Sequence, residues 1–205
     1  LVRLGWSHGD QEVFSIDEMV ALFDIERVNG SAAAFNPSKL LWLNQHYIKN
    51  SDSAHIATHA SFHFGRLGID PSTGPELAAV VNAQRERAKT LVELAQNSIF
   101  FYQDVTAYDP VAAQKHLTAE VREPLNVLLG LLTGLNEWKS QSIHDCIEKV
   151  ATQLGLKLGK IAQPVRVAVT GGTVSPPIDV TLEILGRDAT LRRLERALSY
   201  LSSTP

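Results

Sequence analysis

The sequence of 205 residues predicts an all-α protein. Signals for helix starts recur along the chain, where a Ser, Thr, Asn or Asp precedes a proline or an apolar run. The last segment is the clearest helix, because Leu191, Leu194, Leu198 and Leu201 fall on one helical face. Only Val165–Val169 alternates like a half-buried strand, and no other segment with that pattern offers it a partner. We therefore interpret the whole chain as helical.

The expected helix starts follow one another through the sequence. They are Ser15 with Glu18 (a capping box), Asn36–Pro37, Ser51 or Ser53, Pro75–Glu76, Thr90 with Glu93 (a second capping box), Asp109–Pro110, and Ser142 with Asp145. The third helix is expected to run to Phe64 and to end at Gly65 and Gly68. Gly155 and Gly186 stand where helix C-caps belong. Asp70–Pro75 and the stretch around Glu137–Gln141 are candidate boundaries between domains.

Composition excludes several classes of protein. Hydrophobic residues make up 44% of the chain and charged residues 20%, which is typical of a globular domain with a core of its own. No apolar run approaches the roughly 20 residues that span a bilayer, and no signal peptide is visible. The single Cys146 excludes an internal disulfide framework and a cysteine-rich zinc finger. The chain begins at Leu1 rather than Met, so we expect it to be a piece of a longer protein.

Charge is unevenly distributed along the chain. The net charge of −3 does not indicate a general nucleic-acid binder. However, residues 1–148 hold 11 Lys and Arg against 18 Asp and Glu, whereas residues 149–205 hold 8 against 4. A basic segment on an acidic body is either a polyanion-binding end or ordinary variation in surface charge, and the charges alone leave both open.

None of the short polar motifs makes a convincing catalytic or metal site. His55, His59 and His63 share one helical face, but no carboxylate joins them, so a polar surface is favoured over a zinc or nickel site. Ser7–Asp10 contains the residue types of a hydrolase triad, but triad members meet through the fold and not as neighbours. Thr170–Thr173 lacks the spacing of a phosphate-binding loop. We expect no catalytic residue and no metal ligand in this chain.

A basic elbow is a better candidate for binding. Arg85, Arg87 and Lys89 lie between the end of one expected helix and the capped start of the next at Thr90. Free backbone N–H groups and the helix dipole add to the side-chain charge there, which suits an anion or an unpaired base. A solvated surface turn is the alternative.

Five stretches, in the same order as in the family, resemble bacterial glutamyl-tRNA synthetase. They are Leu1–Glu12, Ala34–Ile48, Lys157–Gly171, Val174–Pro176 and Leu185–Leu198. The resemblance spans the chain and covers the C-terminal, tRNA-reading part of that enzyme. The HIGH-like and KMSKS-like motifs that bind ATP in the family are absent. The resemblance implies that this piece has no cofactor and does not activate glutamate, whereas the parent uses ATP and Mg²⁺.

The resemblance also implies an architecture and partners. It implies a stem-contact helical segment over residues 1–70, followed by two α-helical anticodon-binding subdomains over residues 71–140 and 141–205. It implies that Val165–Val169 is helical. The expected partner is tRNA-Glu, with no DNA and no membrane, and the parent is expected to be monomeric and cytoplasmic. Rival interpretations are a free-standing helical scaffold that binds another protein, and a metal-dependent enzyme that uses the histidine stripe.

Residues are carried over only where they match the motifs of the family. Arg87 matches the position that reads the third anticodon base, where arginine accompanies preference for tRNA-Glu over tRNA-Gln. Arg166 matches a base-contacting arginine, and Ser175, Pro176 and Ile178 match the loop that packs against the splayed anticodon. Trp42 matches a stem-contacting tryptophan, with a core role equally open. Nothing is carried over from residues 95–150. Charge marks the candidate contacts to the tRNA backbone, which are Arg85, Lys89, Lys157, Lys160, Arg192, Arg193 and Arg196.

Overall fold

The computed structural model describes residues 5–30 and 34–203, so the first four residues of the Leu1–Glu12 stretch lie outside it. All regular structure in this part of the chain is helical, as expected. The α-helices are α1 (Ile16–Leu22), α2 (Pro37–Asn50), α3 (Ser53–Arg66), α4 (Leu77–Gln84), α5 (Leu91–Gln96), α6 (Ile99–Tyr102), α7 (Pro110–His116), α8 (Arg122–Thr133), α9 (Ser140–Gln153), α10 (Leu158–Thr170), α11 (Ile178–Leu185) and α12 (Arg187–Ser203). Short 3-10 turns are η1 (Ile25–Arg27), η2 (Pro71–Thr73), η3 (Arg85–Arg87) and η4 (Ala119–Val121).

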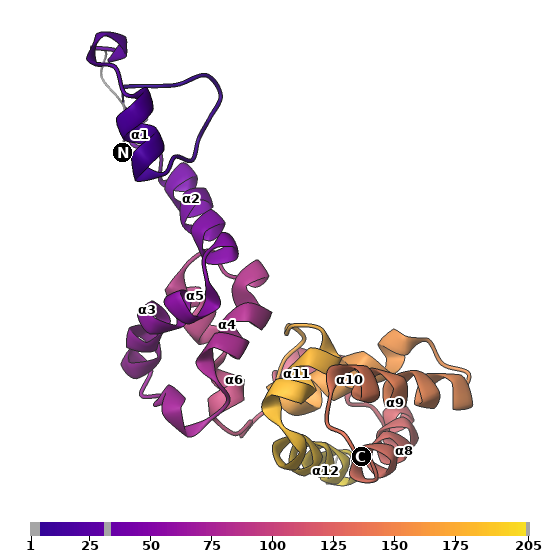
Figure 1. Ribbon diagram of the computed structural model, residues 1–205. Helices are drawn as coiled ribbons and strands as arrows, with labels where there is room; N and C mark the ends of the chain where they lie inside the picture. Colours follow the sequence, from indigo (N-terminus) through magenta and orange to yellow (C-terminus); the bar gives the residue numbers. More distant parts are fainter. Residues whose placement is uncertain (1–4, 31–33, 204–205) are drawn as a thin grey trace.

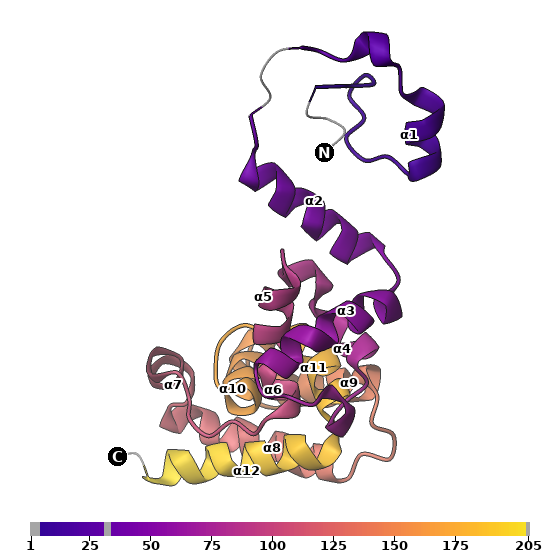
Figure 2. The ribbon, with the colours of Figure 1, turned by 90° about the vertical axis from the view of Figure 1, so that its left-hand side faces the viewer.

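The N-terminal segment with α1 lies apart from the helical body, beyond the far end of α2 (Figures 1 and 2). It is built around Trp6, which is buried and contacts the rings of Phe14 and Phe23. The capping box of Ser15 and Glu18 at the start of α1 is confirmed. Helix α1 itself contains no buried residue. This segment therefore has only a small core of its own.

The first helical unit consists of α2 to α6. Helix α3 packs against both α4 and α5. The shared core includes Ile48 at the end of α2, Phe64 on α3, Val81 on α4 and Leu94 on α5. All four side chains are at most 2% exposed, so this unit is held together by apolar burial. We call it the first unit.

The second unit consists of α7 to α12 around a larger core. Helix α8 packs against α9 and α12, and α10 packs against α9 and α12. Fully buried side chains include Leu128, Ile147, Ile161 and Leu194. The two units touch where α4 packs against α11, and Val80 and Phe101 of the first unit join the core of the second. In Figure 1 the second unit lies beside the first, at the opposite end of the molecule from α1.

The alternating segment Val165–Val169 lies within α10, as the all-α interpretation requires. Val165, Val167, Ala168 and Val169 are all buried. A helix surrounded by neighbours on nearly every side does not need a single apolar stripe. Its sequence therefore loses the 3.6-residue period and can imitate a strand.

The boundaries expected at residues 70 and 140 do not coincide with the division between the two cores. Helix α3 lies before residue 70, yet it shares a core with α4 and α5. Helices α8 and α9 lie on either side of residue 140, yet they pack against each other in the second core. The cores instead divide at the segment between α6 and α7. Loop composition marks where helices end, but not which helices pack together.

Three of the expected helix starts need correction. The cap of α3 is Asp52, which accepts from the N–H of His55, rather than Ser51 or Ser53. Ser142 lies inside α9, which begins at Ser140. Thr90 caps α5 as expected, but the Glu93 carboxylate accepts from the N–H of Lys89 and not from that of Thr90. At α3 the competing acceptor is one position away, whereas the first N–H of α9 donates to Glu183, which is distant in the sequence.

Candidate nucleic-acid interface

The basic elbow forms a 3-10 turn between α4 and the capped start of α5, as expected. Its two arginines point into different surroundings. Arg87 is exposed, whereas the half-buried Arg85 donates from Nε and Nη2 to the carbonyl of Ile48, at 3.1 and 2.9 Å, and also to the carbonyl of Ser51. Arg85 therefore ties the elbow to the end of α2, and its guanidinium is already occupied within the protein.

Lys89 follows at the exposed side of the elbow. Its backbone is fixed at both polar groups, since its carbonyl accepts from Asn44 Nδ2 and its N–H donates to Glu93. Behind it, Ala88 is fully buried in the core of the first unit. The elbow is thus a rigid platform that presents Arg87 and Lys89 to solvent.

Arg166 lies on α10 of the second unit, where it is half-buried. Its Nε donates to Ser175 Oγ at 2.9 Å. Burial, and in addition the positive charge of Arg87, lowers the pKa of Arg166. The positive charge of Arg87 therefore acts on Arg166, although 79 positions separate the two residues in the sequence and they belong to different units.

Ser175 and Pro176 lie in the turn before α11, Ile178 is the first residue of that helix, and all three are buried. The Ser175 hydroxyl accepts from Arg166 and donates to the carbonyl of Pro176 at 2.8 Å. Thr181 adds a hydrogen bond to the same carbonyl at 3.2 Å. The hydroxyl groups of Ser175 and Thr181 therefore stabilise the turn, and that of Ser175 also orients Arg166.

Val174 is the residue of this turn that the sequence reasoning missed. Its side chain is 74% exposed, next to the buried Ser175. An exposed apolar side chain beside an arginine is a surface on which a nucleobase can pack. The Val-Ser-Pro motif contains Val174, but only the geometry of the turn shows which of its residues faces outward.

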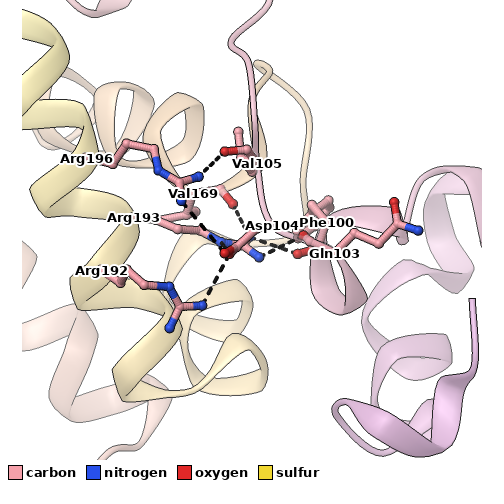
Figure 3. Close-up of polar contacts among 8 residues, drawn as sticks. All are labelled: Phe100, Gln103, Asp104, Val105, Val169, Arg192, Arg193 and Arg196. Carbon is pink, nitrogen blue, oxygen red and sulfur yellow. Dashed lines mark hydrogen bonds and ion pairs between the residues drawn. The ribbon is translucent and has the colours of Figure 1, made fainter.

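The remaining cationic candidates fall into two groups. Lys157 and Lys160 are exposed at the start of α10, where backbone N–H groups of the first turn add to their charge. Arg192 and Arg196 both form ion pairs with Asp104, at 3.2 and 3.7 Å. Arg193, the third of these arginines of α12, differs from the other two because its side chain is 3% exposed and donates to carbonyls inside the protein (Figure 3). A tRNA phosphate cannot reach it in this conformation.

Trp42 is 47% exposed on α2, so it belongs to neither core of the described residues. Its ring contacts His46 at 5.8 Å between ring centroids. Leu40 and Leu41 beside it are also exposed, so α2 carries an apolar surface that no described element covers. The stem-contact role expected for Trp42 stays a prediction.

The histidine stripe and the short polar motifs form no site in the described residues. His55 and His59 meet edge to face at 4.8 Å, but no group of three or more His, Cys, Asp or Glu side chains within residues 5–30 and 34–203 is arranged to hold a metal ion. Thr170–Thr173 is the C-terminal turn of α10. Gly171 there has φ +82°, and a Cβ would meet the carbonyl of Ala107 at 3.1 Å. The backbone conformation and the close packing therefore account for a glycine at position 171, and no bound phosphate is needed to explain it.

The chain is similar to glutamate–tRNA ligases in both sequence and fold. The chain is 58% identical over 98% of its length to glutamate–tRNA ligase 1 of Alkalilimnicola ehrlichii, and 57% identical over the same share to that of Nitrosococcus oceani. It spans 43% of the length of each of these relatives. A crystal structure of a glutamate tRNA ligase from Elizabethkingia meningosepticum matches 97% of this chain and 39% of that one, with a TM-score of 0.86 and 25% identity.

The family match rests on most of the helical body. Residues 51–198, from the start of α3 into α12, match the anticodon binding domain. Across the described part of the chain, none of the helices combines the length and apolar content that crossing a bilayer requires. The chain therefore belongs to the anticodon-binding domain family, in a form closely similar to the matching part of glutamate–tRNA ligases.

Proposed function

We propose that this chain is the tRNA-binding part of a glutamate–tRNA ligase and that it reads the anticodon of tRNA-Glu. The observation that carries this proposal is the exposed Arg87 on the elbow of the first unit, whose charge acts on the half-buried Arg166 of the second unit. These two like charges repel each other, so an anionic or acceptor-rich ligand stabilises them. Unpaired bases of an anticodon loop are such a ligand.

The chemistry of Arg87 suits a cytosine at the third anticodon position. Cytosine has two acceptors, O2 and N3, on its Watson–Crick edge, and a guanidinium can donate to both. Guanine has an N–H donor in the equivalent place, so donor would face donor. By analogy with base readout in DNA, a bidentate contact of this kind discriminates by about 1–3 kcal/mol. Arg166, Val174 and the turn at Ser175 are then available to the neighbouring bases.

The activity of the whole protein belongs to the same proposal. The relatives that are more than twice as long as this chain bear the name glutamate–tRNA ligase, so attachment of glutamate to tRNA is assigned to the parent protein. ATP and Mg²⁺ are assigned to its remaining part, since the described residues form no cluster for the metal and the sequence has no HIGH-like or KMSKS-like motif. A monomeric parent in the cytoplasm, with no DNA or membrane partner, completes the proposal.

Binding of tRNA-Glu at several salt concentrations tests the proposal. We expect the logarithm of the binding constant to fall linearly with the logarithm of salt concentration, because bound phosphates release counterions. Replacing Lys157 and Lys160 together by Gln should make the slope shallower by roughly 1–2. Replacing the similarly exposed Lys139 by Gln, at the loop before α9, is the matched control and should leave the slope unchanged.

Two results would contradict the proposal. Absence of saturable tRNA binding at low salt would favour the rival helical scaffold that binds a protein. Equal affinity for tRNA-Glu and for a tRNA with an altered anticodon would restrict the chain to phosphate contacts.

A further inference from the structure

Arg193 is a buried arginine whose hydrogen bonds all run to other segments of the chain (Figure 3). Its side chain is 3% exposed. Nη1 donates to the carbonyl of Phe100 at 2.8 Å and to that of Val169 at 2.6 Å, and Nη2 donates to the carbonyl of Gln103 at 2.9 Å. Nε lies 3.4 Å from Asp104 Oδ1. One guanidinium thus satisfies three carbonyls and one carboxylate.

The three carbonyls lie at two places in the fold. Phe100 and Gln103 belong to the end of α6, the last helix of the first unit. Val169 lies in the last turn of α10 in the second unit. The carbonyls at a helix C-terminus have no partner within their own helix and carry partial negative charge, so a cation is favourable there. Arg193 therefore fastens two helix ends from different units to α12.

The flanking arginines hold the chain that joins the two units. Arg192 and Arg196 contact opposite oxygens of Asp104, and Arg196 also donates to the carbonyl of Val105. Figure 3 shows all three arginines reaching from one side of α12 to the segment that follows α6. Arg192 and Arg196 are about half exposed, whereas Arg193 is buried. Of these three arginines, only Arg193 donates hydrogen bonds both to the end of α6 in the first unit and to α10 in the second.

The fastened turn of α10 lies next to the candidate interface. Val169 follows Arg166 by three residues, less than one helical turn. On the other side, α6 packs into the same unit as Ala88 and Leu94, which lie behind the elbow that presents Arg87. A rotation of one unit against the other would separate Arg87 from Arg166. The contact of α4 with α11 and the hydrogen bonds of Arg193 both oppose such a rotation.

We propose that Arg193 is a positioning residue for anticodon recognition: by joining the ends of α6 and α10, it holds Arg87 and Arg166 at the separation that a cognate anticodon needs. The proposal rests on the function proposed above and names a residue that does not touch the tRNA. It gives Arg193 a different role from the phosphate contact that its charge suggested.

The first measurement concerns geometry and needs no tRNA. Spin labels on Val92→Cys of α5 and Val111→Cys of α7, two exposed positions in a Cys146→Ser background, report the distance between the units. Arg193→Lys keeps the charge but replaces the planar fork by a single ammonium group, so we expect a broader distance distribution with unchanged helical circular dichroism. Glu195→Gln, at an exposed side chain on α12, is the matched control and should keep the narrow distribution. Asp104→Asn changes an exposed side chain and should broaden the distance distribution less than Arg193→Lys does. It provides a second test of the proposal if the Arg193→Lys protein does not fold.

The second measurement concerns tRNA. Arg193→Lys should reduce the preference for cytosine over guanine at the third anticodon base by about three- to thirtyfold, in the range of indirect coupling between sites. The salt slope of binding should stay that of the unaltered chain, because no phosphate contact is lost. Unaltered distances in both Arg193→Lys and Asp104→Asn, or equal losses for both tRNAs, would overturn the positioning role. If the unaltered chain binds no tRNA, the proposed function fails, whereas the spin-label distances still judge the role of Arg193.

Discussion

Arg85 and Arg87 lie two positions apart in one 3-10 turn, and their side chains point into different surroundings. Arg85 donates to two backbone carbonyls at the junction of α2 and α3, whereas Arg87 is exposed and close enough to Arg166 to lower its pKa. The guanidinium of Arg85 therefore stabilises the fold, whereas that of Arg87 is available to bind a ligand. Substitutions at the two positions should have separable effects.

Arg87→Gln in the parent protein should lower the preference for a cytosine-ending over a guanine-ending anticodon by about tenfold to a hundredfold. The amide of glutamine offers a donor or an acceptor, so it tolerates either base edge. Arg85→Ala is the control: it should leave this ratio unchanged but lower the free energy of unfolding by about 1–3 kcal/mol, because the carbonyls of Ile48 and Ser51 lose their donor. The measurements are charging efficiencies on the two tRNAs and urea unfolding. A change of the ratio in Arg85→Ala alone would reassign the reading residue.

At the scale of elements, α9 lacks a side-chain cap of its own and receives one from α11. Glu183 Oε2 accepts from the N–H of Ser140 at 2.8 Å, and Glu183 Oε1 lies 3.4 Å from Lys139 Nζ. Trp138 Nε1 donates to the carbonyl of Leu182 at 2.9 Å, so α11 holds the whole loop before α9. The Ser140 N–H is the largest cause of the lowered pKa of Glu183, with Lys139 adding to it.

Glu183→Ala should lower the free energy of unfolding at pH 7 by about 1 kcal/mol, the ordinary value of a cap. Because the pKa of Glu183 is lowered in the folded state, its stabilising contribution is complete above the unfolded-state pKa of about 4.3. The contribution is lost as pH falls through the folded-state pKa. The difference between the two proteins in urea unfolding should therefore shrink as the pH is lowered below the unfolded-state pKa. Glu137→Ala, at an exposed side chain in the same loop, is the control, and a pH-independent difference would exclude a carboxylate effect.

At the scale of the whole molecule, the described helical body consists of two units, each with a core of its own. The two units meet through α4 and α11, through apolar side chains around Phe101, and through the arginines of α12 (Figures 1 and 3). These contacts fix the position of one unit relative to the other. Activation of an amino acid needs a nucleotide site in addition.

The purified chain should therefore show no glutamate-dependent exchange between ATP and pyrophosphate, with or without tRNA-Glu. The physical reason is the absence of both ATP-binding motifs from the sequence. The exchange of labelled pyrophosphate into ATP measures this directly, with the full-length parent as the positive control. Exchange that follows the chain through purification, above the level of a mock preparation, would contradict the assignment of catalysis to the remaining part of the parent.

Much of the helical architecture was decided locally. Ser15, Asn36, Thr90 and Asp109 cap their helices as expected, because a short polar side chain satisfies N–H groups only two or three residues away. The family motifs likewise indicated Arg87 and Arg166 as candidate anticodon-binding residues. The order of helices and the identity of these candidates needed no tertiary contact.

The tertiary structure alone decided which helices share a core and which charges remain available. The boundaries expected at residues 70 and 140 followed loop composition, but cores divide between α6 and α7 because packing depends on contacts distant in sequence. Arg192, Arg193 and Arg196 look alike in a helical pattern. Arg193 is buried because the ends of α6 and α10 pack around it, whereas Arg192 and Arg196 are about half exposed. Burial of a charge depends on the carbonyls that surround it, and those carbonyls come from segments some 24 to 93 residues away.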